Sequence, residues 1–444
     1  MLENDLYKKC LHKVPRIRYA DIRTLKRRHL SVALRNNLVD VSDHEDKIVG
    51  CRALDSGYGV SSTNKTDAAN AEAALEQAVE LARGTRASIT LRQVTPEVGS
   101  YEHPVKNKPT VGDAKNLIMF VRDSINDKLD SVKRIEIVFS YTELDAGLVT
   151  SEGTDVKESS STTDLEISLT IRTPSGMSDI KKVTGGKGGM EAIQHRDFDR
   201  IVGDLVIVAR SFAGAKRFSP LESGKKFRVI LDSEAAGALA RLISCMLTAD
   251  GFSSKLFDTL TIPKELEIVD NPSIPGAYGS FVWDDEGVRG RKKVLVSDGS
   301  VDLLHTRLTA GEYDVPGNAH GISQVPKPSM SNVYISTSDW HFDEMLNDTK
   351  QGIFMKGARR AEVNTSSGII ELEPIISYII EQKEIKQAIS NVKMIDTVKN
   401  ILQNIDAIGK LISLIPNTER GFNASTGAPY IRIDGARCAY GVMQ

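Results

Sequence analysis

The sequence predicts an α+β fold: an N-terminal antiparallel sheet with helices, followed by a C-terminal half that is rich in strands. Residues 1–220 alternate strand-like and helix-like segments, whereas strands and turns dominate from residue 227 onward. A chain of 444 residues is long for a single core, so we expect two domains, at residues 1–222 and 223–444. The clearest period-two alternation in the chain is carried by Leu165, Ile167, Leu169 and Ile171.

The N-terminal half contains the most regular patterns. Thr110 is followed three residues later by Asp113, which is the spacing of a helix cap. Helices are predicted at residues 67–83, 110–130 and 197–215. Strands are predicted at residues 17–23, 29–35, 47–55, 134–142, 144–150 and 163–172. This arrangement is typical of an antiparallel sheet with helices on one face.

The second half is punctuated by prolines and ends in a further helical pattern. We place the boundary between the halves near residues 218–226, where turn-forming residues gather. A late helix is predicted at residues 394–410, because apolar residues recur there at helical spacing. Gly185–Gly189 is a glycine-rich stretch that lacks the phosphate-loop pattern, so we expect a flexible loop.

The composition is that of an ordinary globular protein. Hydrophobic residues make up 40% and charged residues 26%, and the net charge is −2. No apolar run is long enough to span a bilayer, and the first residues lack the pattern of a signal peptide. We therefore expect a cytoplasmic protein with no membrane partner.

One basic cluster, at residues 8–28, raises the question of nucleic-acid binding. Apolar residues are interleaved with it, and the acidic residues 40–46 balance its charge. We interpret it as the solvated face of a helix and a strand, and nucleic acid as an unlikely partner.

Cysteine and histidine spacing provides no local metal site. The four cysteines are far apart, with no Cys-x-x-Cys pair, and we expect them to be reduced. No two of the eight histidines are four or five residues apart. His320 is the best-placed single histidine, yet a loop histidine with ordinary hydrogen bonds is the simpler interpretation. Asp284-Asp-Glu-Gly287 resembles a hairpin tip more than an acidic metal site.

The most informative stretch lies in the middle of the chain. A strand-like run at residues 227–231 leads into a helical pattern, with Asp232 or Ser233 as the cap. Glu234 falls in the first turn of that helix, where its charge suits the helix dipole.

This stretch, Ser233-Glu-Ala-Ala-Gly-Ala238, resembles the metal-binding helix of the TldD/PmbA family of peptidase-like proteins. In the zinc-bearing TldD branch the helix carries His-Glu-x-x-x-His, with Glu as general base. Here Glu234 and Gly237 resemble the pattern, but Ser233 and Ala238 stand where the histidines would be. The third ligand of the family, a cysteine, would fall close to Ile415.

The resemblance runs nearly end to end, through several shorter segments that come in the order of the family. These are Val32-Ala-Leu-Arg-Asn-Asn37, Gly57-Tyr-Gly-Val-Ser-Ser-Thr63, Thr150-Ser-Glu-Gly153, Asp284-Asp-Glu-Gly-Val288 and Pro326-Lys-Pro-Ser-Met-Ser-Asn-Val-Tyr334. The resemblance implies that the C-terminal half is a β-rich domain whose strands enclose a peptide groove, which takes extended peptide by strand addition.

The residue types at the degenerate site, Ser233, Glu234, Gly237 and Ala238, do not suit zinc chemistry. Hydrolytic zinc needs about three protein ligands and an open position for water. A hydroxyl is a poor ligand and a methyl group is none. We therefore expect no catalytic residue, no metal and no cofactor in this chain.

Two functions remain open. The first is a non-catalytic TldD/PmbA-family subunit of the TldE/PmbA type, which pairs with a zinc-bearing TldD-type subunit to process unfolded or short peptides. In that case zinc belongs to the partner, and the isolated chain is inactive. The alternative is an active metallopeptidase with a non-standard site that recruits Glu234, His320 or Asp284. Because the segment at residues 326–332 resembles the TldD branch, a degenerate TldD paralogue also remains open.

Overall fold

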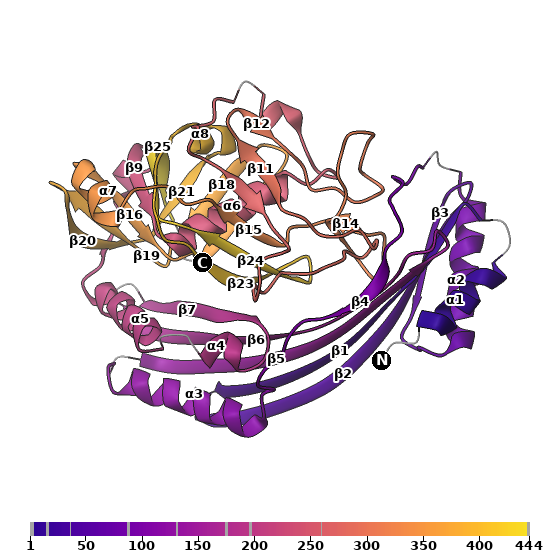
Figure 1. Cartoon of the computed structure of the whole chain (residues 1–444). Helices are drawn as coiled ribbons and strands as arrows, with labels where there is room; N and C mark the ends of the chain where they lie inside the picture. The colour runs from indigo at the N-terminus through magenta and orange to yellow at the C-terminus, as the bar shows by residue number, and fades with distance from the viewer. Residues whose placement is uncertain are drawn as a thin grey trace.

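The computed structural model describes residues 4–14, 17–35, 37–86, 89–129, 132–173, 176–194, 198–258 and 260–441. It confirms the α+β fold. A long curved antiparallel sheet forms the N-terminal half, and the strand-rich C-terminal half lies above it (Figure 1). The domain boundary stays a prediction. The short helix η1 (Pro220–Glu222) and the start of β9 (Lys226–Leu231) lie in that region.

The N-terminal sheet has the order β3-β2-β1-β5-β6-β4, with β7 paired to β6. All of its pairs are antiparallel except β4 with β6. Its strands are β1 (Tyr19–Arg35), β2 (Leu38–Leu54), β3 (Tyr58–Thr63), β4 (Val98–Glu102), β5 (Val132–Thr150), β6 (Asp155–Thr173) and β7 (Gly176–Lys187).

The strands of this sheet are longer than predicted. The segments predicted at 17–23 and 29–35 form the single strand β1, and those at 134–142 and 144–150 form β5. The charged residues between the first two segments do not break the strand, because they pair across it. Arg27 lies 2.7 Å from Asp46, and Arg28 lies 2.8 Å from Asp43.

Helices cover the two ends of the sheet. α1 (Asn4–Lys13) and α2 (Ala68–Gly84) lie at one end, and α3 (Val111–Asn126) and α5 (Phe198–Ala213) at the other, with the short α4 (Glu191–Gln194) nearby (Figure 1). The predicted cap is confirmed: Thr110 Oγ1 accepts a hydrogen bond from Asp113 N at 3.1 Å, and the Asp113 carboxylate accepts one from Thr110 N at 2.9 Å. Residues 130 and 197, at the predicted helix ends, lie outside the described residues.

The C-terminal half consists of two larger sheets and the two-stranded pair β13 (Ala319–His320) and β14 (Lys327–Pro328). The six-stranded sheet contains β10 (Ile268–Asp270), β11 (Lys293–Ser297), β12 (Ser300–Val301), β15 (Asn332–Ile335), β23 (Ser413–Glu419) and β24 (Phe422–Ala428). The ten-stranded sheet contains β8 (Lys216–Arg217), β9, β16 (Gln351–Lys356), β17 (Arg360–Asn364), β18 (Ile369–Glu373), β19 (Ile376–Glu381), β20 (Glu384–Ser390), β21 (Val392–Thr397), β22 (Ile405–Ile408) and β25 (Ile431–Tyr440). The remaining helices are η2 (Ser254–Leu256), α6 (Ser233–Met246), α7 (Phe342–Asp348) and α8 (Val398–Gln403).

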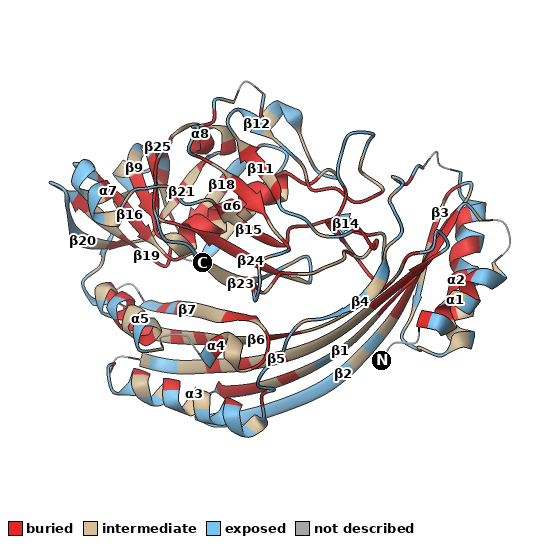
Figure 2. Ribbon diagram, in the orientation of Figure 1, coloured by how far each residue is buried: buried red, intermediate tan, exposed pale blue. Residues whose placement is uncertain are grey.

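Helix α6 is the centre of this half. It contacts β15 and β24 of the six-stranded sheet and β9, β16, β17 and β18 of the other. Apolar residues surround most of it, and its half-buried face is formed by Glu234, Ala238, Arg241 and Cys245. Figure 2 shows the helix among the strands. The sheets therefore fix the start of α6 in place.

Two predictions about the C-terminal half and β7 are wrong. Residues 394–410 form the end of β21, the short α8 and β22, rather than one helix. Their apolar residues are buried as predicted, but spacing alone does not distinguish a helix from two strands that flank one turn. The prediction of a loop at Gly185–Gly189 is also wrong in part, because residues 185–187 are the last three residues of the strand β7.

Buried arginines join the two halves. Arg52 on β2 is fully buried, and its guanidinium lies 2.5 Å from the carboxylates of both Asp21 and Glu286. Arg23 on β1 donates to the backbone carbonyls of Gly321 and Gln324. Within the described part of the chain, no helix has the length and apolar character needed to cross a membrane.

Candidate functional site

The start of helix α6 is the site that the sequence analysis singles out. Strand β9 ends at Leu231, and Asp232 is the cap. Its Oδ1 accepts hydrogen bonds from Ala235 N at 2.9 Å and from Gly357 N at 3.0 Å. Ser233 is the first helical residue and Glu234 lies in the first turn. The cap thus anchors α6 to both its own first turn and the end of β16.

Glu234 is paired with a lysine that the sequence analysis did not single out. Lys182 on β7 donates a hydrogen bond to Glu234 Oε2, and each side chain is 20% exposed. Burial raises the pKa of Glu234, and Asp232 adds to the rise, whereas Lys182 opposes it. Burial acts to lower the pKa of Lys182, but Glu234 and Asp232 outweigh it and raise that pKa overall.

A cavity of about 790 Å³, which we name the α6 cavity, lies beside this pair. Its lining comes from α5, β6, β7, α7 and the start of β23 and includes Ser233, Glu234 and Ile415. The structure therefore brings together the first helix position and the position predicted for a third ligand. One histidine, His341, also lines the cavity, and its Nε2 lies 3.0 Å from Lys410 Nζ.

Gly237 and Ala238 pack against other parts of the C-terminal half. A Cβ built at Gly237 would lie 3.3 Å from the backbone of Gly427, so the glycine permits close packing of α6 against β24. Ala238 packs against the main C-terminal core.

The residues beside Glu234 do not fit a zinc ion. Ser233 offers a neutral hydroxyl, Ala238 a methyl group and Ile415 an alkyl chain, while the Lys182 ammonium donates to one oxygen of the Glu234 carboxylate. Among the described residues there is no group of three or more His, Cys, Asp or Glu side chains arranged to hold a metal. No chemical step through zinc follows from this site.

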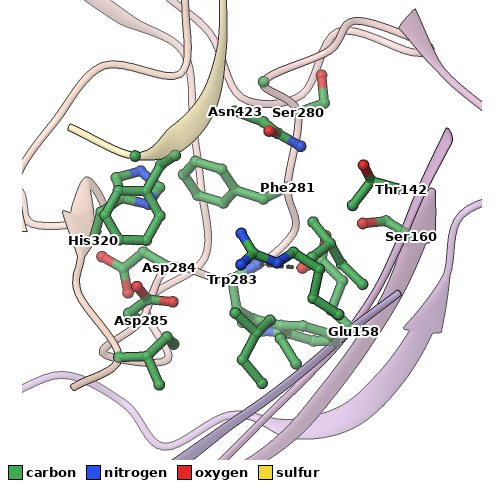
Figure 3. Close-up of a pocket in the computed structure, with 18 of the residues that line it drawn as sticks. Thr142, Glu158, Ser160, Ser280, Phe281, Trp283, Asp284, Asp285, His320 and Asn423 are labelled. Carbon is green, nitrogen blue, oxygen red and sulfur yellow. Dashed lines mark hydrogen bonds between the residues drawn. The ribbon is translucent and has the colours of Figure 1, made fainter. Parts of the chain in front are cut away.

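His320 and Asp284 lie in a different cavity, of about 460 Å³, between the N-terminal sheet and the C-terminal half. We name it the sheet cavity. Figure 3 shows His320, Asp284 and Asp285 at one end of it, with Thr142, Glu158 and Ser160 on the opposite strands. The structure therefore does not bring Glu234 together with His320 and Asp284.

The geometry of β7 explains this separation. Lys182 lines the α6 cavity and Lys187 lines the sheet cavity. They are an odd number of residues apart on one strand whose pairing with β6 has no register break, so their side chains point to opposite faces of the sheet.

The segment at Asp284 is a turn, as predicted. The Asp284 carboxylate accepts hydrogen bonds from the backbone N–H groups of Glu286, Val288 and Ala319 at 2.9 to 3.0 Å, and Gly287 has a φ of 74°. Burial raises the pKa of Asp284 to about 7, with a contribution from Glu286. Its oxygens accept from backbone donors of the turn and of β13.

His320 is packed between aromatic rings. Its ring centroid lies 5.4 Å from that of Phe281 and 4.9 Å from that of Phe422. Burial lowers the pKa of His320, against the opposing charges of Asp285 and Asp270. The ordinary hydrogen bonds expected of it are incomplete, because Nε2 has no partner among the described residues.

Comparison with known proteins agrees with this architecture. Two profiles of one family match the chain: PmbA/TldA metallopeptidase domain 1 at residues 20–82 and the PmbA/TldA metallopeptidase C-terminal domain at residues 223–440. These matches define a metallopeptidase-like fold. The chain belongs to the PmbA/TldD family.

Curated relatives and solved structures extend the match over nearly the whole chain. A metalloprotease of Methanocaldococcus jannaschii is 28% identical over 413 residues, which is 88% of this chain and 90% of that protein. A metalloprotease of Methanothermobacter thermautotrophicus is 26% identical and covers 95% of each chain. The structure of TldE from Thermococcus kodakarensis is similar in fold, with a TM-score of 0.78 at 15% identity and coverage of 98% of this chain and 99% of that one.

Proposed function

We propose that this chain is a non-catalytic TldD/PmbA-family subunit that pairs with a zinc-bearing TldD-type subunit, and that the pair processes unfolded or short peptides in the cytoplasm. The zinc and its ligands belong to the partner, and the isolated chain is inactive. The family membership and the likeness to TldE support this proposal.

The observation that carries the proposal is the pair formed by Lys182 and Glu234. A general base in such a peptidase must reach a water molecule whose pKa has been lowered. A nearby metal ion is the usual means of lowering that pKa. Here the carboxylate is held by an ammonium group instead. The α6 cavity remains large enough for an extended segment, and its lining is the natural place for peptide contact.

The alternative, an active metallopeptidase with a non-standard site, is favoured by one observation: several relatives bear the name metalloprotease. It requires scattered residues such as Glu234, His320 and Asp284 to act together at one centre. Glu234 lines one cavity, His320 and Asp284 line the other, and the oxygens of Asp284 are committed to backbone donors. We therefore favour the non-catalytic subunit.

The pairing surface is expected on the C-terminal half, beside the α6 cavity. Leu411 is 82% exposed and Ile412 40% exposed, an uncommon placement for two adjacent large apolar side chains. A permanent interface buries such residues, because its composition is as apolar as that of a protein core.

Co-expression with a zinc-bearing relative from the same source tests the proposal. We expect one complex by size-exclusion chromatography, with stoichiometric zinc that is lost when the relative's histidines are replaced. Leu411→Glu should weaken the complex, whereas Leu38→Glu, at an exposed position on the N-terminal sheet, should not. Recovery of this chain alone, carrying about one tightly held zinc per chain, would defeat the proposal.

A further inference from the structure

We propose that the sheet cavity is a binding site for a carboxylate carried on an aromatic or aliphatic body, such as phenylpropanoate or the C-terminal residue of a peptide. The site is separate from the α6 cavity and does not depend on pairing or on zinc. It rests on the residues that line the cavity and on which of their polar atoms remain without partners.

The body of the ligand is specified by the cavity walls. The floor is the concave face of β1, β5 and β6, where the apolar side chains are Leu25, Leu144, Ala146, Leu148 and Val156. Phe281, Trp283 and Phe422 contribute aromatic rings from the C-terminal half. A volume of about 460 Å³ with such walls suits a small organic molecule.

The charge of the ligand is specified by an unused hydrogen-bond donor. That donor is not Arg23, which is 1% exposed and held by protein: its Nη1 donates to the carbonyls of Gly321 and Gln324, and its Nε lies 3.2 Å from the Asp21 carboxylate. Lys187 lines the same cavity, and no hydrogen bond or ion pair of its ammonium is found among the residues described. A buried donor without a partner is costly, so the Lys187 ammonium favours an acceptor ligand.

The carboxylates around the cavity do not supply that acceptor. Glu158 accepts hydrogen bonds from Val282 N at 2.9 Å and Trp283 N at 3.2 Å, and lies 2.7 Å from His103 Nε2. Asp284 accepts hydrogen bonds from three backbone amides. Asp285 accepts a hydrogen bond from Gly321 N at 2.6 Å. These carboxylates are therefore engaged by protein donors, and the ammonium of Lys187 is left for a ligand.

A carboxylate on an apolar body fits this cavity better than a compact inorganic anion does. An ammonium forms a charge-assisted hydrogen bond with a carboxylate oxygen, and the apolar floor gives a bare anion nothing to contact. The same chemistry is present in a free aromatic acid and in the C-terminus of a short peptide.

The two tryptophans of the chain permit a direct test, because Trp283 lines the sheet cavity and Trp340 the α6 cavity. In a Trp340→Phe chain, the fluorescence of Trp283 alone is followed during titration with 3-phenylpropanoate and with 3-phenylpropanamide, its neutral isostere. Acetate, inorganic phosphate and Gly-Gly-Phe with a free or an amidated C-terminus complete the series. Tighter binding of the acid or of the free peptide identifies which of the two sources the site prefers.

We expect the acid to bind at least about tenfold more tightly than its amide, since the carboxylate gains charge-assisted hydrogen bonds. Lys187→Met should remove most of that preference and Lys187→Arg should keep it, while binding of the amide stays unchanged in both. Equal affinities for acid and amide, or tightest binding of phosphate, would overturn the proposal. So would a response seen from Trp340 in a Trp283→Phe chain but absent from Trp283.

Discussion

Lys182 and Glu234 form a hydrogen-bonded ion pair between β7 of the N-terminal sheet and the first turn of α6, 52 residues apart in sequence. Both residues line the α6 cavity. The pair holds a positive charge against the carboxylate that the sequence analysis singles out.

Breaking this pair should reveal a coupling energy. Lys182→Met leaves a largely buried carboxylate without its partner, and Glu234→Gln leaves a largely buried ammonium. The two substitutions together should be less harmful than the sum of the single ones, by about 0.5 to 3 kcal/mol. Urea denaturation of the four chains measures this. Additivity within about 0.3 kcal/mol would show that solvent already screens the pair.

Glu234→Gln should leave the peptidase activity of a complex with a zinc-bearing relative within about twofold of the unmodified complex, because a carboxylate without a metal is not positioned as a general base. The matched control is the corresponding glutamate of the relative, whose replacement should lower the rate by about a hundredfold or more. Steady-state hydrolysis of an unfolded peptide measures both. A hundredfold loss from Glu234→Gln alone would identify this chain as the catalyst.

The buried ammonium of Lys187 should make stability depend on pH. Burial lowers the pKa of Lys187 from 10.5 to about 8, with Glu158 opposing. The folded chain therefore binds fewer protons than the unfolded chain between these values, and the stability of the natural chain rises with pH across that window. Below pH 8 the full penalty of burying the charge applies. Lys187→Met should accordingly raise the melting temperature at pH 7 by about 2 °C or more, and the gain should shrink by pH 9.5.

Lys181→Met is the control for this measurement. Lys181 is exposed and lies 2.7 Å from Glu166, so its replacement should have a small effect with no such change between pH 7 and pH 9.5. A gain from Lys187→Met that is equal at the two pH values would contradict the lowered pKa.

Arg52→Met should be strongly destabilising. It removes the guanidinium that pairs with the fully buried carboxylates of Asp21 and Glu286, although Asp21 keeps Arg23, whose Nε lies 3.2 Å away. Removing one member of such a group costs about 3 to 5 kcal/mol. Arg35→Met removes an exposed arginine that lies 2.5 Å from Glu136, and should cost about 1 kcal/mol or less. Thermal unfolding compares the two. Similar losses of stability from both substitutions would show that the contacts of Arg52 contribute no more than those of Arg35.

Much of the fold was predictable because its signals are local. The cap at Thr110, the helix α2 and the strand that leads into α6 each depend on residues within one or two turns. The long strands were divided incorrectly because Arg27 and Arg28 resemble a break until their partners on β2 are known.

The site was predictable only in part. Asp232 and Glu234 stand where the local pattern puts them. Lys182 was missed because β7 was not predicted and because its partner lies on another element. Arg23, Lys187 and His320 meet at the sheet cavity from distant parts of the chain, so no spacing within the sequence indicates them.

The contact of Arg52 with Glu286 has a consequence for any attempt to divide the protein. A fragment that ends at residue 222 would keep Arg52 and Asp21 but expose them, and a fragment that begins at residue 223 would carry Glu286 without a counter-charge. Each piece would keep most of its own apolar core but lose this buried charge contact. Severed there, the two pieces would behave as a split protein whose parts restore that contact by binding each other.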